Sequence, residues 1–258
     1  MSLTHTVFPL DDPLAKDASK VGGKTAGLAA FIGILPVPKG YVVSSDGITP
    51  MGIAEGVQAQ LEKLLLPEGD DFWPVAVRSS GIGEDSSDAS FAGQHETVLN
   101  VTNEKELEVA VIECIDSFYS PRVISYRRQK GISTSISDIH ASVLVQCMVP
   151  ADWSAVAFGK NIATGADQIV INMAPGLGDK IVSGQCNPVE IILNKDDGKL
   201  VSIDAGDFTD VKIPVGNAKV IIDALRTIES SWDKGPVDME CAFIGKDFYL
   251  LQARPITV

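Results

Sequence analysis

The chain has 258 residues, 45% of them hydrophobic, and its 34 acidic and 21 basic residues give a formal net charge of −13. This length and apolar content suffice for a substantial core in one large domain or two smaller ones. The negative charge argues against nucleic acid or an anionic membrane as the main partner. There is no apolar run long enough to span a bilayer and no basic leader before an apolar stretch, so we expect a soluble cytoplasmic protein.

The metal-binding residue types give no zinc signature. The four cysteines, at 114, 147, 186 and 241, are widely scattered and form no C-x-x-C pair. The three histidines have no metal-ligand spacing with a cysteine or with one another. We therefore expect reduced, partly buried thiols and no zinc site.

In the first half of the chain, a Gly-Gly-Lys run at 22–24 precedes an alanine-rich stretch, which predicts a short helix with the lysine at its start. Residues 40–44 and 75–79 are typical of strands. Residues 80–96 are rich in glycine, serine and acidic residues and predict a long loop, a feature that is usually functional or disordered in compact domains.

The remainder of the chain begins with two predicted helices and continues mainly with strands. Helices are predicted at 104–118 and from 120 to 131, and the serine-rich segment 133–139 is the best candidate for a domain boundary. Beyond it one helix is predicted near 217–230, among strands at 142–148, 154–159, 167–172, 188–193, 237–243 and 248–253. This pattern predicts an α+β fold with mixed or antiparallel sheets in two lobes, residues 1–139 and 140–258.

Two cations could meet an anion in the first lobe. Lys24 follows two glycines at a predicted helix start, where backbone N–H groups and a cation can face an anion together, although a solvated loop lysine explains the pattern equally well. Arg78 ends an apolar strand and is costly to bury unless it is paired with an acid or a phosphate. A salt bridge to Glu84 or Asp85 is the structural alternative. The loop beginning at Ser79 and Ser80 supplies hydroxyls and glycines suited to covering phosphates.

The last stretch of the chain predicts a polar hairpin. Asp238 and Glu240 lie on one face of a strand, and Gln252 and Arg254 on one face of the next. A connecting loop with an odd number of residues would place Glu240 opposite Gln252 and Asp238 opposite Arg254. Two carboxylates, an amide and a guanidinium suit magnesium and a polyphosphate, and a simple cross-strand ion pair is the alternative.

Two further segments have both a binding and a structural interpretation. The run Gln146-Cys147-Met148-Val149 ends an apolar strand and could present backbone groups to an adenine edge with Met148 on the ring, or belong to the core. The turn Gly176-Leu177-Gly178 could approach a ligand closely, or be only a turn.

The order of these segments resembles one family. The segments are VGGK from Val21, VAVRSSGIGEDSSDASFAGQHETVLNV from Val75, VQCMVPADWSAVAF from Val145, GLGDKIVSGQCNP from Gly176 and DMECAFIGKDFYLLQARPITV from Asp238. They are similar to the ATP-binding domain of phosphoenolpyruvate synthase, pyruvate phosphate dikinase and rifampin phosphotransferase, an ATP-grasp domain. The similarity covers almost the whole chain.

The resemblance implies roles for the residues singled out above. It assigns Lys24, Arg78 and Arg254 to catalysis on the ATP phosphates, and Glu240 and Gln252 to Mg²⁺. Its nucleotide-binding set is Lys24, Arg78, Thr97, Gln146, Met148, Val149, Asp238, Gln252 and Arg254. Metal and cations would neutralise the transferring phosphoryl group and hold it in line.

The resemblance also implies a missing acceptor. The family's complete enzymes continue into a swivelling domain with a phosphorylated histidine, whereas this sequence stops just past the last motif. His95 stands where the family commonly has glutamine, and a neutral loop histidine is the favoured interpretation. We therefore expect a module that passes the β-phosphoryl group of ATP to a histidine on a separate domain or protein, with AMP and phosphate as products. The alternatives are a stand-alone kinase or ATPase and a non-catalytic regulatory module that binds nucleotide.

Overall fold

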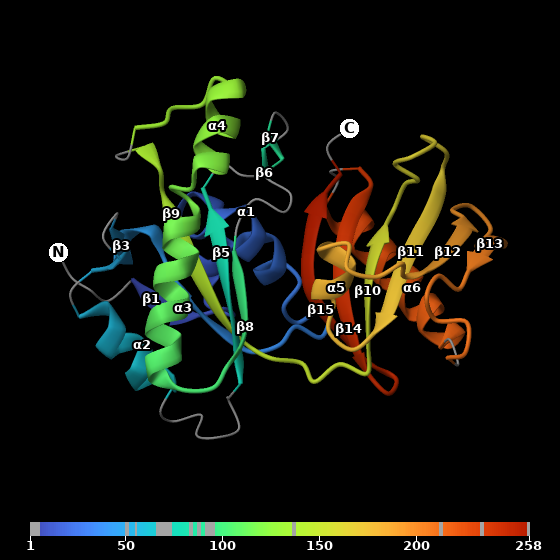
Figure 1. Ribbon diagram of the computed structural model, residues 1–258, viewed down its shortest axis with the longest axis horizontal. Helices are drawn as coiled ribbons and strands as arrows, with labels where there is room; N and C mark the ends of the chain where they lie inside the picture. Colours follow the sequence, from blue (N-terminus) through green and yellow to red (C-terminus); the bar gives the residue numbers. More distant parts are fainter. Residues whose placement is uncertain are drawn as a thin grey trace. The chain divides into compact units, whose positions relative to one another are not determined.

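The computed structural model describes residues 6–49, 52–54, 56–65, 74–82, 85–86, 89–90, 96–135, 138–211, 214–232 and 235–256. The chain divides into two units. Unit 1 comprises Met1–Ala30 and Pro38–Met148, and unit 2 comprises Phe31–Val37 and Val149–Val258. Figure 1 shows the ribbon of the chain with most of its helices and strands labelled.

The units divide the chain at a different place from the predicted boundary after residue 139. The strand β9 (Ala141–Cys147) lies in the sheet of unit 1, where it pairs antiparallel with β2 (Gly40–Val43) and β5 (Val75–Gly81). A boundary at 139/140 would remove the middle strand of that sheet. The serine-rich segment before β9 is therefore a connection inside unit 1.

Unit 1 is built on a five-stranded sheet in which every pair of neighbouring strands is antiparallel. Its strands, in spatial order, are β1 (Val7–Pro9), β2, β9, β5 and β8 (Thr97–Val101). Smaller pieces complete the unit: the 3-10 turns Pro13–Lys16 and Ser45–Gly47, and the short strands β3 (Ile48–Thr49), β4 (Gly52–Ile53), β6 (Asp85–Ser86) and β7 (Ala89–Ser90).

Helices cover both faces of this sheet. Alternate side chains such as Val77 and Val145 form a core with α2 (Val57–Leu65) and α3 (Glu104–Ser117). Fully burying an aliphatic side chain of this size contributes about 1.5–3 kcal/mol. The helix α1 (Ala18–Ala29) packs against β5 and β9. It approaches the face that carries Ser80 and Ser142, because their hydroxyls reach the carbonyl of Val21.

The helix starts of unit 1 follow from local sequence. Asn103 caps α3 through a bond from the Glu106 N–H to its side chain, and the Glu106 carboxylate accepts a bond from the Thr102 N–H. Ser120 caps α4 (Pro121–Gln129), which has its proline at the first helical position. The helix α1 starts earlier than predicted, at Ala18 after the cap Asp17, and Gly22 interrupts it with φ +75°. Gly22 is therefore a break within a helix, and Lys24 follows that break.

Unit 2 is built on a six-stranded antiparallel sheet. Its strands, in spatial order, are β13 (Leu200–Asp204), β12 (Val189–Asn194), β11 (Gln168–Pro175), β10 (Trp153–Phe158), β14 (Val237–Ile244) and β15 (Asp247–Pro255). The long helix α6 (Val215–Trp232) packs against β14, and the short helix α5 (Asp179–Val182) against β10 and β11. The predicted α+β class is therefore confirmed.

Sequence patterns missed two edge strands. The strand β1 has only three residues, too few to show a period, and every residue of β13 is exposed. An exposed edge strand lacks the alternation of buried and polar side chains by which strands are recognised.

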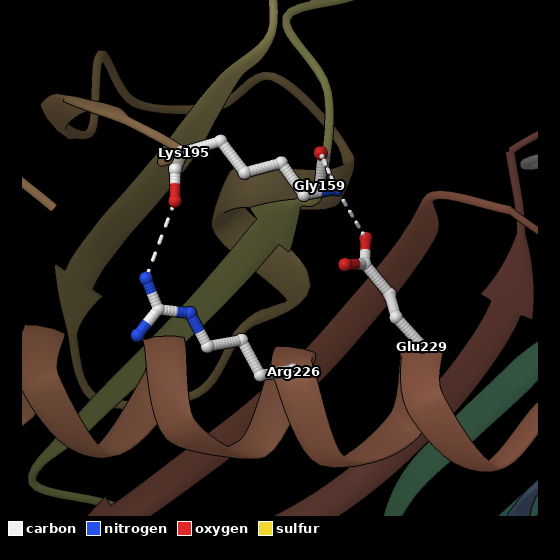
Figure 2. Close-up of polar contacts among 4 residues, drawn as sticks. All are labelled: Gly159, Lys195, Arg226 and Glu229. Atoms are coloured by element: carbon white, nitrogen blue, oxygen red, sulfur yellow. Dashed lines mark hydrogen bonds and ion pairs between the residues drawn. The ribbon is translucent and has the colours of Figure 1, made fainter. Parts of the chain in front are cut away.

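A polar cluster fastens the turn after β12 to α6 in unit 2. Lys195 Nζ donates to the Gly159 carbonyl at 2.7 Å and to Glu229 Oε1 at 2.9 Å, while Arg226 Nη2 donates to the Lys195 carbonyl at 3.2 Å (Figure 2). A Cβ atom at position 159 would overlap the Glu229 carboxylate, so any larger residue there would require Glu229 to move away from Lys195. The cluster joins three elements that are far apart in the sequence.

Candidate functional site

The final hairpin brings the four predicted polar residues to one face of the sheet of unit 2. Asp238 pairs with Arg254 and Glu240 pairs with Gln252, as the sequence predicts. The route differs from the predicted odd-numbered loop. Ile244 pairs with Asp247 across a two-residue turn, and the register then shifts by one residue between Glu240 and Cys241.

A β-bulge at Leu251 produces this shift. Cys241 pairs with Leu250 and Glu240 with Gln252, so Leu251 is the extra residue of β15. Without it, the two-residue turn would place Leu251 opposite Glu240 and turn Gln252 and Arg254 to the other face. The bulge therefore assembles the polar patch.

Asp238 and Arg254 form an ion pair within this patch. The Nε and Nη2 atoms of Arg254 lie 2.7 and 2.5 Å from the same carboxylate oxygen, Oδ2 of Asp238. Both side chains are mostly buried, with 9% of the aspartate and 19% of the arginine exposed. The cross-strand ion pair considered as an alternative is therefore present, in a fork geometry that fixes the guanidinium plane.

Glu240 and Gln252 form the neighbouring pair and suit a magnesium ion. Glu240 is partly exposed, and it lies between Gln252 on β15 and Val156 on β10. Among the described residues, no three His, Cys, Asp or Glu side chains gather as a metal site. Mg²⁺ in nucleotide enzymes is typically held by one or two carboxylates together with phosphate oxygens and water. One accessible carboxylate beside an amide fits that coordination.

Charge near Glu240 also affects a buried thiol. Burial, and then the Glu240 carboxylate, raise the pKa of Cys241 well above its usual range. In unit 1, burial raises the pKa of Cys114 to about 12. Both thiols stay protonated at neutral pH, which makes them structural residues without nucleophilic reactivity.

The first set of predicted residues shares one face of the sheet of unit 1. Arg78 on β5 pairs with Thr97 on β8, and Arg78 Nη1 lies 3.4 Å from Gln146 Oε1 on β9. Gln146 is buried and its amide nitrogen donates to the Pro38 carbonyl. The Gln146 side chain is thus held in place between Pro38 and Arg78, and it supports Arg78. Thr97 is exposed.

A close backbone contact places Lys24 over the same face. The break at Gly22 packs on β5 so tightly that a Cβ atom there would come within 2.5–2.7 Å of Ser80 Oγ and of the carbonyl oxygens of Ser80 and Gly81. Ser80 Oγ donates to the Val21 carbonyl at 2.7 Å and accepts from the Thr25 N–H at 3.1 Å. These contacts fix the backbone on both sides of Lys24.

Ser142 on β9 completes this anchor. Its Oγ lies 2.5 Å from the Val21 carbonyl oxygen and 2.7 Å from that of Ser80. The hydroxyls of Ser79 and Ser80, which the sequence offers for phosphates, are buried in β5 and bonded to the carbonyls of Glu96 and Val21. That prediction was wrong because the strand extends through Gly81, and the hydroxyls bind protein backbone instead.

The proposed adenine segment lies where unit 1 ends and unit 2 begins. The Met148 N–H donates to the Pro74 carbonyl, and the Val149 carbonyl accepts from Ala151. Met148 is partly exposed and Val149 is buried. These two backbone groups already have partners within the chain.

The glycine turn after β11 is held from β10. The Gly176 N–H donates to the Asp152 carbonyl, and Ser154 Oγ donates to the Gly176 carbonyl at 2.7 Å. Asp152 Oδ2 also accepts from the Gly245 N–H in the hairpin turn. Sequence reasoning missed both residues as supports of this turn, because an Asp and a Ser near a strand start carry no distinctive pattern.

Some predicted features lie outside the described residues. These are His95, Glu84 and most of the glycine- and serine-rich loop before Thr97, together with the side chain of Asp85.

Comparison with known proteins gives the family. Residues 49–210 match the family described as the pyruvate phosphate dikinase, AMP/ATP-binding domain. The chain belongs to this family.

The curated relatives of this family member are longer proteins. A probable phosphoenolpyruvate synthase of Archaeoglobus fulgidus is 33% identical over 316 residues, which cover 97% of this chain and 41% of that protein. The phosphoenolpyruvate synthase of Neisseria meningitidis serogroup B is 34% identical over 238 residues, covering 78% of this chain and 30% of that protein. The chain thus spans less than half the length of either relative.

Among solved structures, D-alanine–D-alanine ligase from Helicobacter pylori matches 90% of this chain and 53% of that chain, with 14% identity and a TM-score of 0.44. Within the described part of the chain, none of the helices has the length and apolar character needed to cross a bilayer.

Proposed function

We propose that this family member is an ATP·Mg²⁺-binding phosphotransferase module that passes the β-phosphoryl group of ATP to a histidine on a separate domain or protein, with AMP as one product and the γ-phosphoryl group released to water as phosphate. The observation that carries the proposal is the bulge-set register of the last hairpin, which places a carboxylate–guanidinium pair beside a carboxylate–amide pair. Both belong to a chain of an AMP/ATP-binding family.

The proposal assigns several polar residues to the phosphates of ATP. In unit 1, Lys24 and Arg78 neutralise phosphate charge, Thr97 contacts the same phosphates and Gln146 supports Arg78. In unit 2, Arg254 contacts phosphate. Fixed cations stabilise the charge of a transferring phosphoryl group without reorganisation during the reaction.

The remaining residues of the set bind the base and the metal. Met148 and Val149 line the adenine position. Glu240 and Gln252 hold Mg²⁺, and Asp238 belongs to the same polar patch. Mg²⁺ held by these residues would supply positive charge that lowers the repulsion among the phosphate oxygens.

The experiment is chromatographic analysis of nucleotides after incubation with ATP and Mg²⁺, alone and with a phosphohistidine-domain protein from the same source. We expect AMP only when the partner is present. ADP formed by the protein alone would overturn this proposal in favour of a direct kinase or ATPase. Tight ATP binding without any product would favour a regulatory nucleotide-binding module.

A matched pair of variants connects this activity to the hairpin. Glu240→Gln should abolish formation of AMP and leave the fold intact. Glu190→Gln is the control, because Glu190 lies on the same face of the sheet, in line with Glu240 through Val156 and Asn172. Transfer by Glu240→Gln at the parental rate would contradict the metal assignment.

A further inference from the structure

Asp238 occupies a different environment from Glu240, although both point to the same face of β14. Its neighbour on β15 is Arg254, and its neighbour on β10 is Phe158. An aromatic ring on one side and a guanidinium on the other direct the carboxylate toward the guanidinium, because burial of a charge is favourable only where it is paired. Glu240 faces the neutral amide of Gln252 instead.

The backbone already holds Asp238 and Arg254 opposite each other. They are directly paired residues of β14 and β15, so the ion pair is not needed to bring the strands together. What it adds is orientation, since two donors on one carboxylate oxygen fix both the position and the plane of the guanidinium. An arginine that is oriented before its ligand arrives loses less side-chain entropy on binding.

We propose that Asp238 is a positioning residue, which holds the Arg254 guanidinium for the polyphosphate and influences the nucleotide only through Arg254. The inference rests on the proposed function and deepens it, because it separates the two acids of the hairpin. In this proposal Glu240 binds Mg²⁺, and Asp238 fixes the orientation of the Arg254 guanidinium. The sequence resemblance places both acids in direct contact with ligand or metal.

A double-mutant cycle on ATP affinity tests this inference, with calorimetry at one fixed Mg²⁺ concentration. Asp238→Asn in the parental chain should weaken ATP binding about tenfold, the size expected for loss of a charge-assisted bidentate contact. In an Arg254→Gln background, the same substitution should change ATP affinity by less than about twofold, because coupled residues do not contribute additively. An equal loss in both backgrounds would overturn the inference, since Asp238 would then contact the nucleotide or the metal itself.

The cycle needs a check on folding, because Arg254→Gln leaves a mostly buried carboxylate without its cation. If that variant fails to fold, a magnesium titration of ATP binding to Asp238→Asn, whose side chain keeps the same shape, replaces the cycle. The half-saturating Mg²⁺ concentration should match that of the parental chain. An increase would identify Asp238 as a metal ligand and contradict the inference.

A charge swap distinguishes positioning from a purely structural pair. Combining Asp238→Arg with Arg254→Asp restores the ion pair, and we expect the melting temperature to recover relative to either single variant while ATP affinity stays low. Parental ATP affinity in Asp238→Asn, or in the swapped protein, would show that the pair supports only the fold. Failure of the parental chain to bind ATP would instead count against the proposed function, so the two failures are distinguishable.

Discussion

Lys24 of unit 1 and Arg254 of unit 2 are both proposed phosphate-binding cations, but different forces hold them. The backbone around Lys24 is fixed by uncharged contacts. Gly22 lies directly against β5 because it has no Cβ atom, and the hydroxyls of Ser80 and Ser142 bond to the Val21 carbonyl. Arg254 is fixed by the charge of Asp238 on the neighbouring strand. The first arrangement is therefore sensitive to added or removed volume, and the second to charge.

The difference also predicts whether a substitution in each arrangement lowers stability, ATP binding or both. Close packing on the sheet belongs to the core of unit 1, so a change there lowers stability and binding together. The ion pair links two strands that the backbone already joins, so a change that keeps the shape of the side chain, such as Asp238→Asn, should lower binding more than stability. The predictions below test this contrast.

The largest effect is expected for Gly22→Ala. A Cβ atom would meet Ser80 Oγ and two backbone oxygens within 2.5–2.7 Å, at a residue with φ +75°. Strain and overlap together should destabilise the protein by about 3 kcal/mol or more in denaturant unfolding. ATP binding should be lost with the fold.

Gly131→Ala is the matched control for this change. Gly131 also has positive φ, +68°, but no atom lies within 4 Å of its Cβ position. Backbone strain alone should then cost about 1–2 kcal/mol. Equal destabilisation by the two substitutions would show that the close contact at Gly22 has no energetic role.

Ser142→Ala tests the hydroxyl part of the anchor. Ser142 is fully buried, and its loss leaves the carbonyls of Val21 and Ser80 with one donor fewer. We expect a destabilisation of about 1–3 kcal/mol. The exposed Ser125 provides the control, since Ser125→Ala should change stability by no more than about 0.5 kcal/mol.

Much of the fold could be predicted from the sequence. Strands with alternating or continuous apolar residues were identified, and the hairpin residues were paired correctly even though the turn length was not. The Leu251 bulge escaped prediction because a single extra residue in a strand has no compositional sign. The anchor around Lys24 escaped because Ser80 and Ser142 are far apart in sequence, and only the packed sheet shows that both bind one carbonyl.

The family resemblance identified candidate residues that patterns alone left open. Thr97 carries no chemical signal of its own, and its placement opposite Arg78 emerges from the strand register. The domain boundary was misplaced because a serine-rich run predicts a loop but does not show which sheet the next strand will join.

Lys195→Met tests whether the Lys195–Glu229 ion pair, unlike the Asp238–Arg254 pair, stabilises the fold without affecting ATP binding. The substitution breaks the contacts to Gly159 and Glu229 shown in Figure 2. The side chain of Lys195 is 24% exposed and that of Glu229 is 17% exposed. We expect a loss of about 1–2 kcal/mol in denaturant unfolding of unit 2. Because the cluster joins elements and carries no proposed ligand residue, ATP affinity of the folded protein should stay parental.

The control is Lys219→Met, which removes the highly exposed pair with Asp223. Such pairs contribute about 0–1 kcal/mol, so stability should hardly change. A loss of ATP affinity in folded Lys195→Met would contradict the distinction between the two mostly buried ion pairs.

Thr25→Val should have the smallest effect. The Thr25 hydroxyl is buried, and in the described part of the chain it has no hydrogen-bond partner. Valine has nearly the same shape and removes an unsatisfied polar atom, so stability should be unchanged or higher by about 1 kcal/mol. Thermal unfolding measures this, and a clear destabilisation would reveal a role for the hydroxyl in the anchor.

The most direct test of the account is a calorimetric titration with ATP and Mg²⁺ of the parental chain, Lys24→Met and Glu240→Gln, with unfolding followed in parallel. The account predicts that each substitution weakens ATP binding by about tenfold or more, the loss expected for one charge-assisted contact to phosphate or metal, with little change in stability. Parental affinity in either folded variant would contradict the proposed role of that residue in binding ATP.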